Sequence, residues 1–173
     1  MQQYVFIING SGGVGKDTIC ALAARYWRTR TISSITPILK LARQAGWDGK
    51  KTPDSRRFLA DLKQACIAFN DLPFRYCMEQ YQNFLKSDDE ILFAHIREPS
   101  EMTRFQQVVS VPCYAILVRR PSSEKVWGNC ADDNVGAYPY DGVFLNDRTL
   151  DDLPEQTRRF FQKFLADDKQ LTC

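Results

Sequence analysis

Nine residues near the start of the chain have the types and spacing of a loop that binds phosphate. Residues 10–18 read GSGGVGKDT, in which Gly10, Gly15 and Lys16 fit the pattern G-x-x-x-x-G-K. Glycines let the backbone turn tightly and bring its N–H groups close to phosphate oxygens, and the lysine adds a positive charge. We expect the phosphates of a nucleotide to bind at the following residues: Gly10, Ser11, Gly12, Gly13, Val14, Gly15, Lys16, Asp17 and Thr18.

The residue after Lys16 departs from the usual pattern. Asp17 stands where most such loops have a hydroxyl that binds Mg²⁺, and Thr18 follows it. Two interpretations of Asp17 are open. It contacts the metal through water, with Mg²⁺ held mainly by ATP, or it only stabilises the start of the next helix as an acid. Thr18 is placed to bond an α-phosphate oxygen.

Phosphoryl transfer needs positive charge around the moving phosphate more than it needs covalent chemistry. Arg97, Arg119 and Arg120 each follow an apolar run that reads as a buried strand. Ligands bind at strand ends in open α/β sheets. We therefore predict that Lys16 and these three arginines are catalytic, and the alternative for each arginine is a solvated surface charge.

A second group of residues is predicted to bind the phosphate acceptor. A loop tryptophan can stack on a base and an aspartate can accept its hydrogen bond, although both can equally close the edge of the core. The chain's one histidine lies inside an apolar strand, where a structural role is the commoner case. The predicted acceptor residues are Trp47, Asp48, Arg56, Arg57, His95 and Arg97.

Three polar residues near strand ends have two interpretations each. Asn146 follows the last apolar run, where it either lies near the adenine of a bound nucleotide or forms an ordinary turn. Glu98 and Glu101 either orient Arg97 or a metal-bound water, or they favour the first turn of the next helix. We predict Asn146 as a nucleotide-binding residue.

The elements that position these residues follow from hydrophobic spacing. Short apolar runs predict strands, and apolar residues three and four apart predict helices. Strands are expected at residues 3–9, 31–34, 90–96, 113–118 and 141–145, and helices at 16–28, 36–45, 55–69, 74–85, 98–107 and 153–165. The alternation predicts a three-layer α/β fold, with a parallel five-stranded sheet and helices on both faces. We expect one domain, 1–173, with an acceptor-binding helical region at about 35–86 and a lid-like loop at about 119–140.

Composition excludes several classes. The chain has 173 residues and a net charge of +2, which gives no reason to expect binding to nucleic acid or membranes. Its apolar runs are far shorter than the roughly 20 residues that cross a bilayer. The six cysteines form no C-x-x-C pair, so we expect reduced thiols, mostly buried or half-buried, in a cytoplasmic protein that is a monomer or homodimer.

Several segments resemble the nucleoside monophosphate kinases, and GKDT at 15–18 most resembles the phage-type deoxynucleoside monophosphate kinases. The others are SITPILKLA at 34–42, WDGKKTPDSRRFLADL at 47–62, FAHIREPSEMTRF at 93–105 and YDGVFLNDRTLDDL at 140–153. The resemblance implies a P-loop kinase fold, ATP and Mg²⁺ as cofactors, and a nucleotide as the small-molecule acceptor. His95 stands where that family more often has an acid, and the loop after Arg120 differs from its lid.

Three functions remain open at this point. The first is ATP-dependent phosphoryl transfer to a nucleoside or deoxynucleoside monophosphate. The second is a small-metabolite kinase with a non-nucleotide acceptor, and the third is an ATP-binding module without turnover, which the unusual Asp17 and His95 favour. A regulatory GTPase is disfavoured because the N-K-x-D guanine signature is missing from the sequence.

Overall fold

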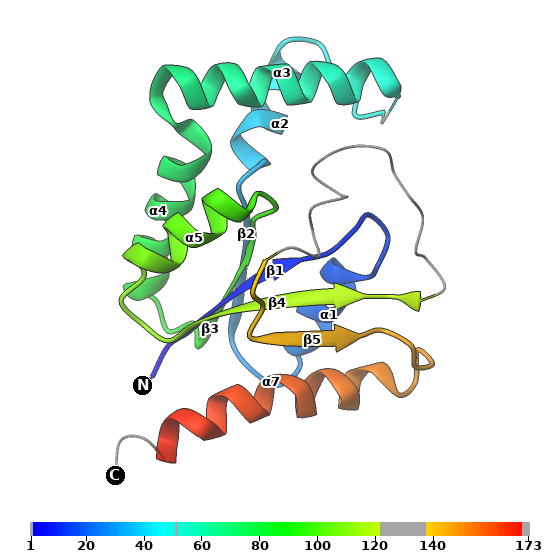
Figure 1. Cartoon of the computed structure of the whole chain (residues 1–173), viewed down its shortest axis with the longest axis vertical. Coiled ribbons are helices and arrows are strands. Elements are labelled where there is room, and N and C mark those ends of the chain that lie inside the picture. The colour runs from blue at the N-terminus through cyan, green and yellow to red at the C-terminus, as the bar shows by residue number, and fades with distance from the viewer. Residues whose placement is uncertain (1, 51, 122–137, 171–173) are drawn as a thin grey trace.

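A parallel sheet of five strands forms the centre of the molecule (Figure 1). The computed structural model describes residues 2–50, 52–121 and 138–170. Every pair of neighbouring strands is parallel, in the order β2-β3-β1-β4-β5. The strands are β1 (Tyr4–Asn9), β2 (Thr29–Ser33), β3 (Ile91–His95), β4 (Cys113–Arg119) and β5 (Gly142–Leu145).

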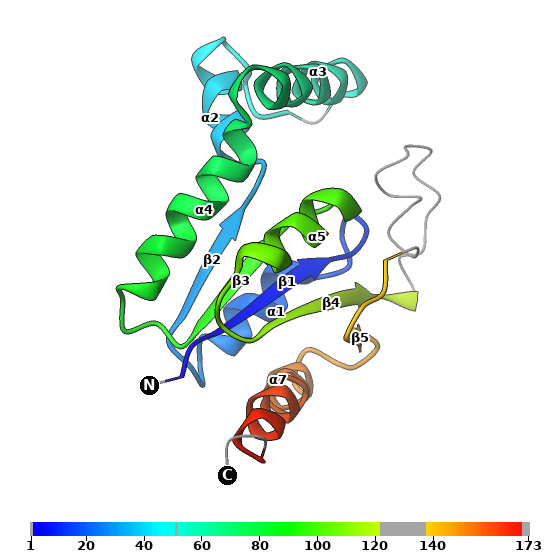
Figure 2. The same cartoon turned by 60° about the vertical axis from the view of Figure 1, so that its left-hand side comes forward.

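Six helices within the described residues connect or follow these strands. They are α1 (Lys16–Ala23), α2 (Thr36–Gln44), α3 (Pro53–Asn70), α4 (Leu72–Leu85), α5 (Pro99–Val108) and α7 (Leu153–Gln170). Figures 1 and 2 show α1 and α7 on one side of the sheet and α4 and α5 on the other. The predicted three-layer fold is therefore confirmed.

The position of β1 at the centre of the sheet explains the continuous apolar run in its sequence. All six of its residues are buried, because its two faces contact two different cores. Phe6 and Ile8 pack with α1 and α7, and the ring centroids of Phe6 and Phe161 are 4.9 Å apart. Val5 and Ile7 pack with α4 and α5. A strand covered on both faces carries apolar side chains at every position rather than alternating with polar ones.

The first helix is shorter than predicted. It was expected to reach residue 28, but α1 ends at Ala23, and Tyr26 is 40% exposed rather than part of the buried stripe. The backbone N–H groups of Arg25 and Tyr26 bond to the carbonyls three residues earlier, at Leu22 and Ala23. This tighter turn redirects the chain into β2, which begins two residues earlier than predicted, at Thr29.

The helix α3 lies away from the sheet, against α2 and α4 (Figures 1 and 2). It begins at Pro53 because the Thr52 side chain caps it, accepting a hydrogen bond from the Ser55 N–H at 3.2 Å. None of its residues is buried, and Phe69 is 87% exposed, so its apolar stripe does not enter the main core. An ion pair of 2.9 Å between Lys63 and Glu101 connects it to α5.

The four cysteines in the described residues are free thiols, as predicted. Cys20 and Cys77 are buried, and Cys66 and Cys113 are half-buried. Cys130 and Cys173 lie outside the described residues, as does most of the predicted lid-like loop, residues 122–137. Over the part of the chain that the structure describes, no helix combines the length and the apolar composition needed to cross a bilayer.

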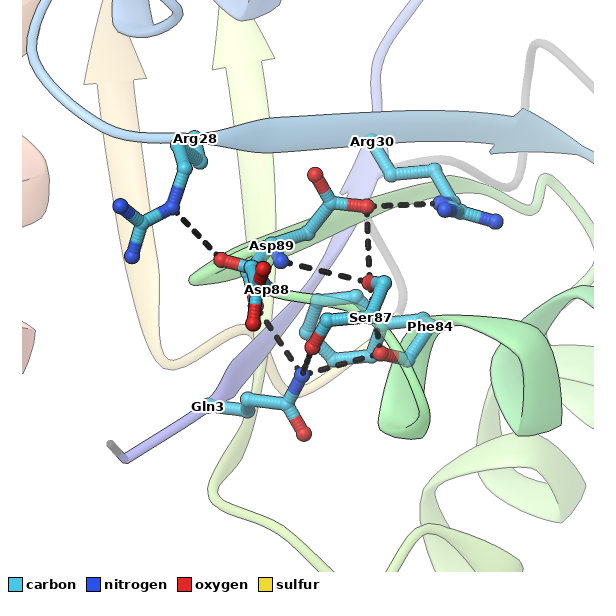
Figure 3. A network of polar contacts seen from close by, with 7 residues as sticks. All are labelled: Gln3, Arg28, Arg30, Phe84, Ser87, Asp88 and Asp89. Atoms are coloured by element: carbon cyan, nitrogen blue, oxygen red, sulfur yellow. Dashed lines mark hydrogen bonds and ion pairs between the residues drawn. The ribbon is translucent and has the colours of Figure 1, made fainter.

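A network of polar contacts fastens the turn after α4 to the amino ends of the strands (Figure 3). The side-chain amide of Gln3 donates to the carbonyls of Phe84, Ser87 and Asp89, at 2.9, 3.3 and 3.0 Å. In β2, Arg30 pairs with the Asp89 carboxylate at 2.9 Å. The network therefore joins three segments at the edge of the sheet opposite the glycine loop.

We expect Gln3→Ala to lower the free energy of unfolding by about 1–2 kcal/mol, because the carbonyls of Ser87 and Asp89 lose a donor, whereas that of Phe84 still accepts from the Ser87 N–H and hydroxyl. Urea denaturation measures the change. Gln82→Ala, at an exposed position of α4, is the matched control and should change stability by less than about 0.5 kcal/mol. Equal effects from the two variants would show that the carbonyls are satisfied without Gln3.

Candidate phosphate-binding site

The glycine loop, residues 10–16, connects the end of β1 to the start of α1 and has three glycines in the left-handed region. Gly10, Gly13 and Gly15 have φ values of +142°, +82° and +94°. A Cβ at Gly10 would lie 2.4 Å from the backbone oxygen of Val118, and one at Gly15 would lie 2.5 Å from Nδ2 of Asn146. The loop is therefore a closely packed turn. At residues 10 and 15 only glycine fits without displacing a neighbouring atom.

The side chain of Asn146 packs against this loop and bonds to it. It is 7% exposed, and its Nδ2 donates to the Val14 carbonyl at 2.8 Å. Its own backbone N–H donates to the Arg119 carbonyl at 2.7 Å. Asn146 was predicted to bind the nucleotide or to form a turn. In the structure its side-chain amide bonds to the loop and its backbone N–H bonds to the end of β4, and contact with the adenine of a nucleotide stays a prediction.

The loop ends at an open helix terminus. Gly15 is the N-cap of α1 and, having no side chain, does not itself cap the first turn. The Lys16 ammonium bends back over the loop and donates to the carbonyls of Gly10 and Ser11, the latter at 2.8 Å. Backbone N–H groups, the positive end of the helix dipole and the ammonium are thus gathered at one place. Such an arrangement binds anions, phosphate above all.

His95, at the end of β3, contacts the first turns of α1. Its Nδ1 lies 3.8 Å from Oδ1 of Asp17 and its Nε2 lies 3.6 Å from Sγ of Cys20. The histidine side chain is 13% exposed, whereas that of Asp17 is 98% exposed. Burial lowers the pKa of His95, and the nearby Asp17 carboxylate only partly opposes this. Burial also raises the pKa of the Cys20 thiol. At neutral pH the pair is therefore an uncharged imidazole and an uncharged thiol.

The lowered pKa of His95 predicts how stability depends on pH. Because the unfolded chain binds this proton more readily than the folded one, stability is complete above the unfolded pKa of 6.5 and falls as the pH drops below it. His95 is the only histidine, so a His95→Asn variant should lose the part of the decline seen between about pH 5 and 7. Urea denaturation at several pH values in this range measures the free energy of unfolding of both proteins. If it falls equally with decreasing pH in the wild type and in His95→Asn, the decline does not come from His95.

Asn9 is a site residue that the sequence reasoning did not identify. It is 1% exposed, and its Nδ2 donates to the Arg97 carbonyl and to the Tyr140 hydroxyl, each at 3.0 Å. Its Oδ1 accepts from the Gly10 N–H at 2.8 Å. Asn9 thus ties the start of the glycine loop to the end of β3 and to the chain before β5. The one signal for it was a polar residue closing an otherwise apolar strand.

The catalytic arginines predicted from the sequence lie at the ends of the two strands beside β1. Arg97 follows β3 by two residues, Arg119 is the last residue of β4, and Arg120 comes next. All three are exposed. Because β3 and β4 lie parallel to β1 on either side of it, these three residues and Lys16 all lie at the carboxyl ends of the strands.

The other predicted acceptor residues belong to the layer formed by α2 and α3. Trp47 donates from Nε1 to the Lys50 carbonyl at 3.0 Å, and Asp48 accepts from the Lys50 N–H at 2.9 Å. Both therefore shape the turn between the two helices. Arg56 and Arg57 are exposed near the start of α3. Figure 1 shows this end of α3 apart from the sheet, on the side toward which β1 and β4 point.

The residues present suit a magnesium ion only as part of a nucleotide complex. The described residues contain no group of three or more His, Cys, Asp or Glu side chains that could hold a metal. Asp17 offers one exposed carboxylate beside Lys16. One carboxylate with the remaining positions left to phosphates and water is a common arrangement for Mg²⁺.

The strand order and the glycine loop after β1 define an α/β fold of the P-loop kinase type. Two solved structures share this fold over nearly the whole chain. One is a candidate kinase from Chloroflexus aurantiacus, with 12% identity and a TM-score of 0.59, over 96% of this chain and 98% of that chain. The other is TT1252 from Thermus thermophilus, with 16% identity and a TM-score of 0.54, over the same shares. No family model matches the chain, and no curated protein matches it in sequence.

Proposed function

We propose that this protein is a phosphotransferase that moves the γ-phosphoryl group of ATP to a nucleoside or deoxynucleoside monophosphate. The observation that carries the proposal is the glycine loop, where Lys16 lies across a turn that opens onto the start of α1. The shared fold with a candidate kinase supports the reaction class. The resemblance of the α2 and α3 segments to nucleoside monophosphate kinases supports the acceptor class.

In this mechanism the loop and Lys16 bind the β- and γ-phosphates, and the helix terminus stabilises charge as it develops during transfer. Arg97, Arg119 and Arg120 supply positive charge from the neighbouring strand ends. Bound Mg²⁺ would supply further neutralisation of the phosphates, and Asp17 would be the protein group nearest to it. Arg56 and Arg57 would bind the phosphate of the acceptor after the α2 and α3 layer approaches the sheet.

An acceptor screen tests the proposal. The protein is mixed with ATP, Mg²⁺ and each ribonucleoside or deoxyribonucleoside monophosphate, or with sugars and other phosphorylated metabolites. Mass spectrometry then detects an acceptor that has gained one phosphoryl group. Reactions without acceptor and reactions with excess EDTA are the controls.

The outcomes separate the three candidate functions. A phosphorylated nucleotide supports the proposal, and product from a non-nucleotide acceptor alone would show the acceptor class to be wrong. Tight ATP binding in calorimetry without any product would favour a binding module, which the unusual Asp17 and His95 motivate. Absence of binding to any nucleoside triphosphate would overturn the proposal.

A further inference from the structure

Asp17 places a negative charge directly beside the proposed phosphate site. It follows Lys16 in the first turn of α1, and its side chain is 98% exposed. The start of a helix favours a carboxylate, but the same position also attracts the phosphates of a nucleotide. Carboxylate and phosphate therefore compete for one region of positive potential, and the orientation of Asp17 decides how strongly they repel each other.

The residue that can set this orientation is His95. Its ring lies between β3 and α1 and contacts two α1 residues that are three positions apart, Asp17 and Cys20. The buried thiol of Cys20 stays protonated, so it can donate to Nε2 of the ring. The ring proton then resides on Nδ1, which faces the Asp17 carboxylate. In this tautomer Nε2 accepts from the thiol, and Nδ1–H lies on the side of the Asp17 carboxylate, whose nearest oxygen at 3.8 Å is too far for a direct hydrogen bond and is attracted through the ring dipole alone.

We propose that His95 is a positioning residue that directs the Asp17 carboxylate toward the phosphate site, so that the site selects the magnesium complex of the nucleotide over the metal-free nucleotide. This inference rests on the proposed function. A carboxylate repels metal-free ATP more strongly than its magnesium complex, because Mg²⁺ cancels part of the phosphate charge. Asp17 would in this way replace the usual hydroxyl with a charge filter.

Calorimetry with ATP in excess Mg²⁺ and in excess EDTA tests the charge filter. For Asp17→Asn we expect affinity in EDTA to rise roughly tenfold while affinity in Mg²⁺ changes little. Asp54→Asn is the matched control, since Asp54 is also an exposed acid in the first turn of a helix, α3. An unchanged ratio of the two affinities in Asp17→Asn would overturn the inference, whereas loss of binding in both conditions by the wild type would overturn the proposed function instead.

Two substitutions of His95 separate positioning from packing. Asn places an N–H near the position of Nδ1, whereas Gln places one near the position of Nε2. The quantity compared is the affinity for ATP in Mg²⁺ divided by the affinity in EDTA. We expect this ratio to stay close to the wild-type value in His95→Asn and to approach the value of Asp17→Asn in His95→Gln. In the Asp17→Asn background neither change should have a further effect on the ratio. Equal ratios for His95→Asn and His95→Gln would contradict a positioning role.

The tautomer can be observed directly. Because the chain has one histidine, a ¹⁵N–¹H long-range correlation spectrum contains the imidazole signals of His95 alone. We expect a protonated Nδ1 and an unprotonated Nε2 near neutral pH. The opposite pattern would remove the contact with Asp17 and with it the inference, without any bearing on whether the protein transfers phosphate.

Discussion

Gly10→Ala is expected to lower the free energy of unfolding by about 3 kcal/mol and to abolish nucleotide binding. Gly10 has a φ of +142°, and a Cβ there would lie 2.4 Å from the Val118 carbonyl oxygen and 3.1 Å from Cγ2 of Val14. The oxygen belongs to the backbone of a central strand, so it cannot move aside as the end of a flexible side chain could. The loop must therefore shift away from β4, which displaces the N–H groups that we propose bind the phosphates.

Gly13→Ala is the matched control for this prediction. Gly13 also has a positive φ, +82°, but nothing lies within 4 Å of the position of its Cβ. We expect about 1 kcal/mol of destabilisation from the backbone conformation alone. Urea denaturation and ATP calorimetry on both variants measure the difference. If Gly10→Ala and Gly13→Ala lower the free energy of unfolding equally, the contact between the loop and β4 is not what requires glycine at residue 10.

Most of the fold was predictable because hydrophobic spacing reports burial. The run at residues 3–9 predicted a buried strand, and β1 is indeed covered on both faces. The end of α1 was not predictable in this way. Leu22, Ala23 and Tyr26 continue a helical spacing, and only the need to enter β2 turns the chain at Ala23. Tertiary requirements overrode local propensity at that point.

The glycine loop could be located from the sequence because its conformation depends on residue types close together in the chain. The residues that support it could not, because their contacts are distant in sequence. Asn146 bonds to Val14, 132 residues away, and Asn9 bonds to Tyr140, 131 residues away. For Trp47 the sequence left base stacking and closure of the core edge equally open, and the structure adds only that its indole N–H bonds to Lys50 within the same turn.

Lys16→Met is expected to lower kcat/KM for phosphoryl transfer by roughly a hundred- to a thousandfold, the effect of removing one preorganised charge at a transition state. Stability should change by no more than about 1.5 kcal/mol, because the ammonium donates to two carbonyls, Gly10 and Ser11, at the edge of the loop. The methionine keeps most of the length of the side chain and removes only its charge and its donors.

Lys86→Met provides the comparison for Lys16→Met, since Lys86 is the exposed C-cap of α4, next to Ser87 of the polar network at the amino ends of the strands. Both variants lose one positive charge, so a general electrostatic effect on nucleotide attraction would appear in both and would weaken with added salt. A loss of activity confined to Lys16→Met, with stability lowered by no more than about 1.5 kcal/mol, indicates that the ammonium acts on the phosphates at short range. Full activity in Lys16→Met would mean that the glycine loop is not where the phosphoryl group is transferred.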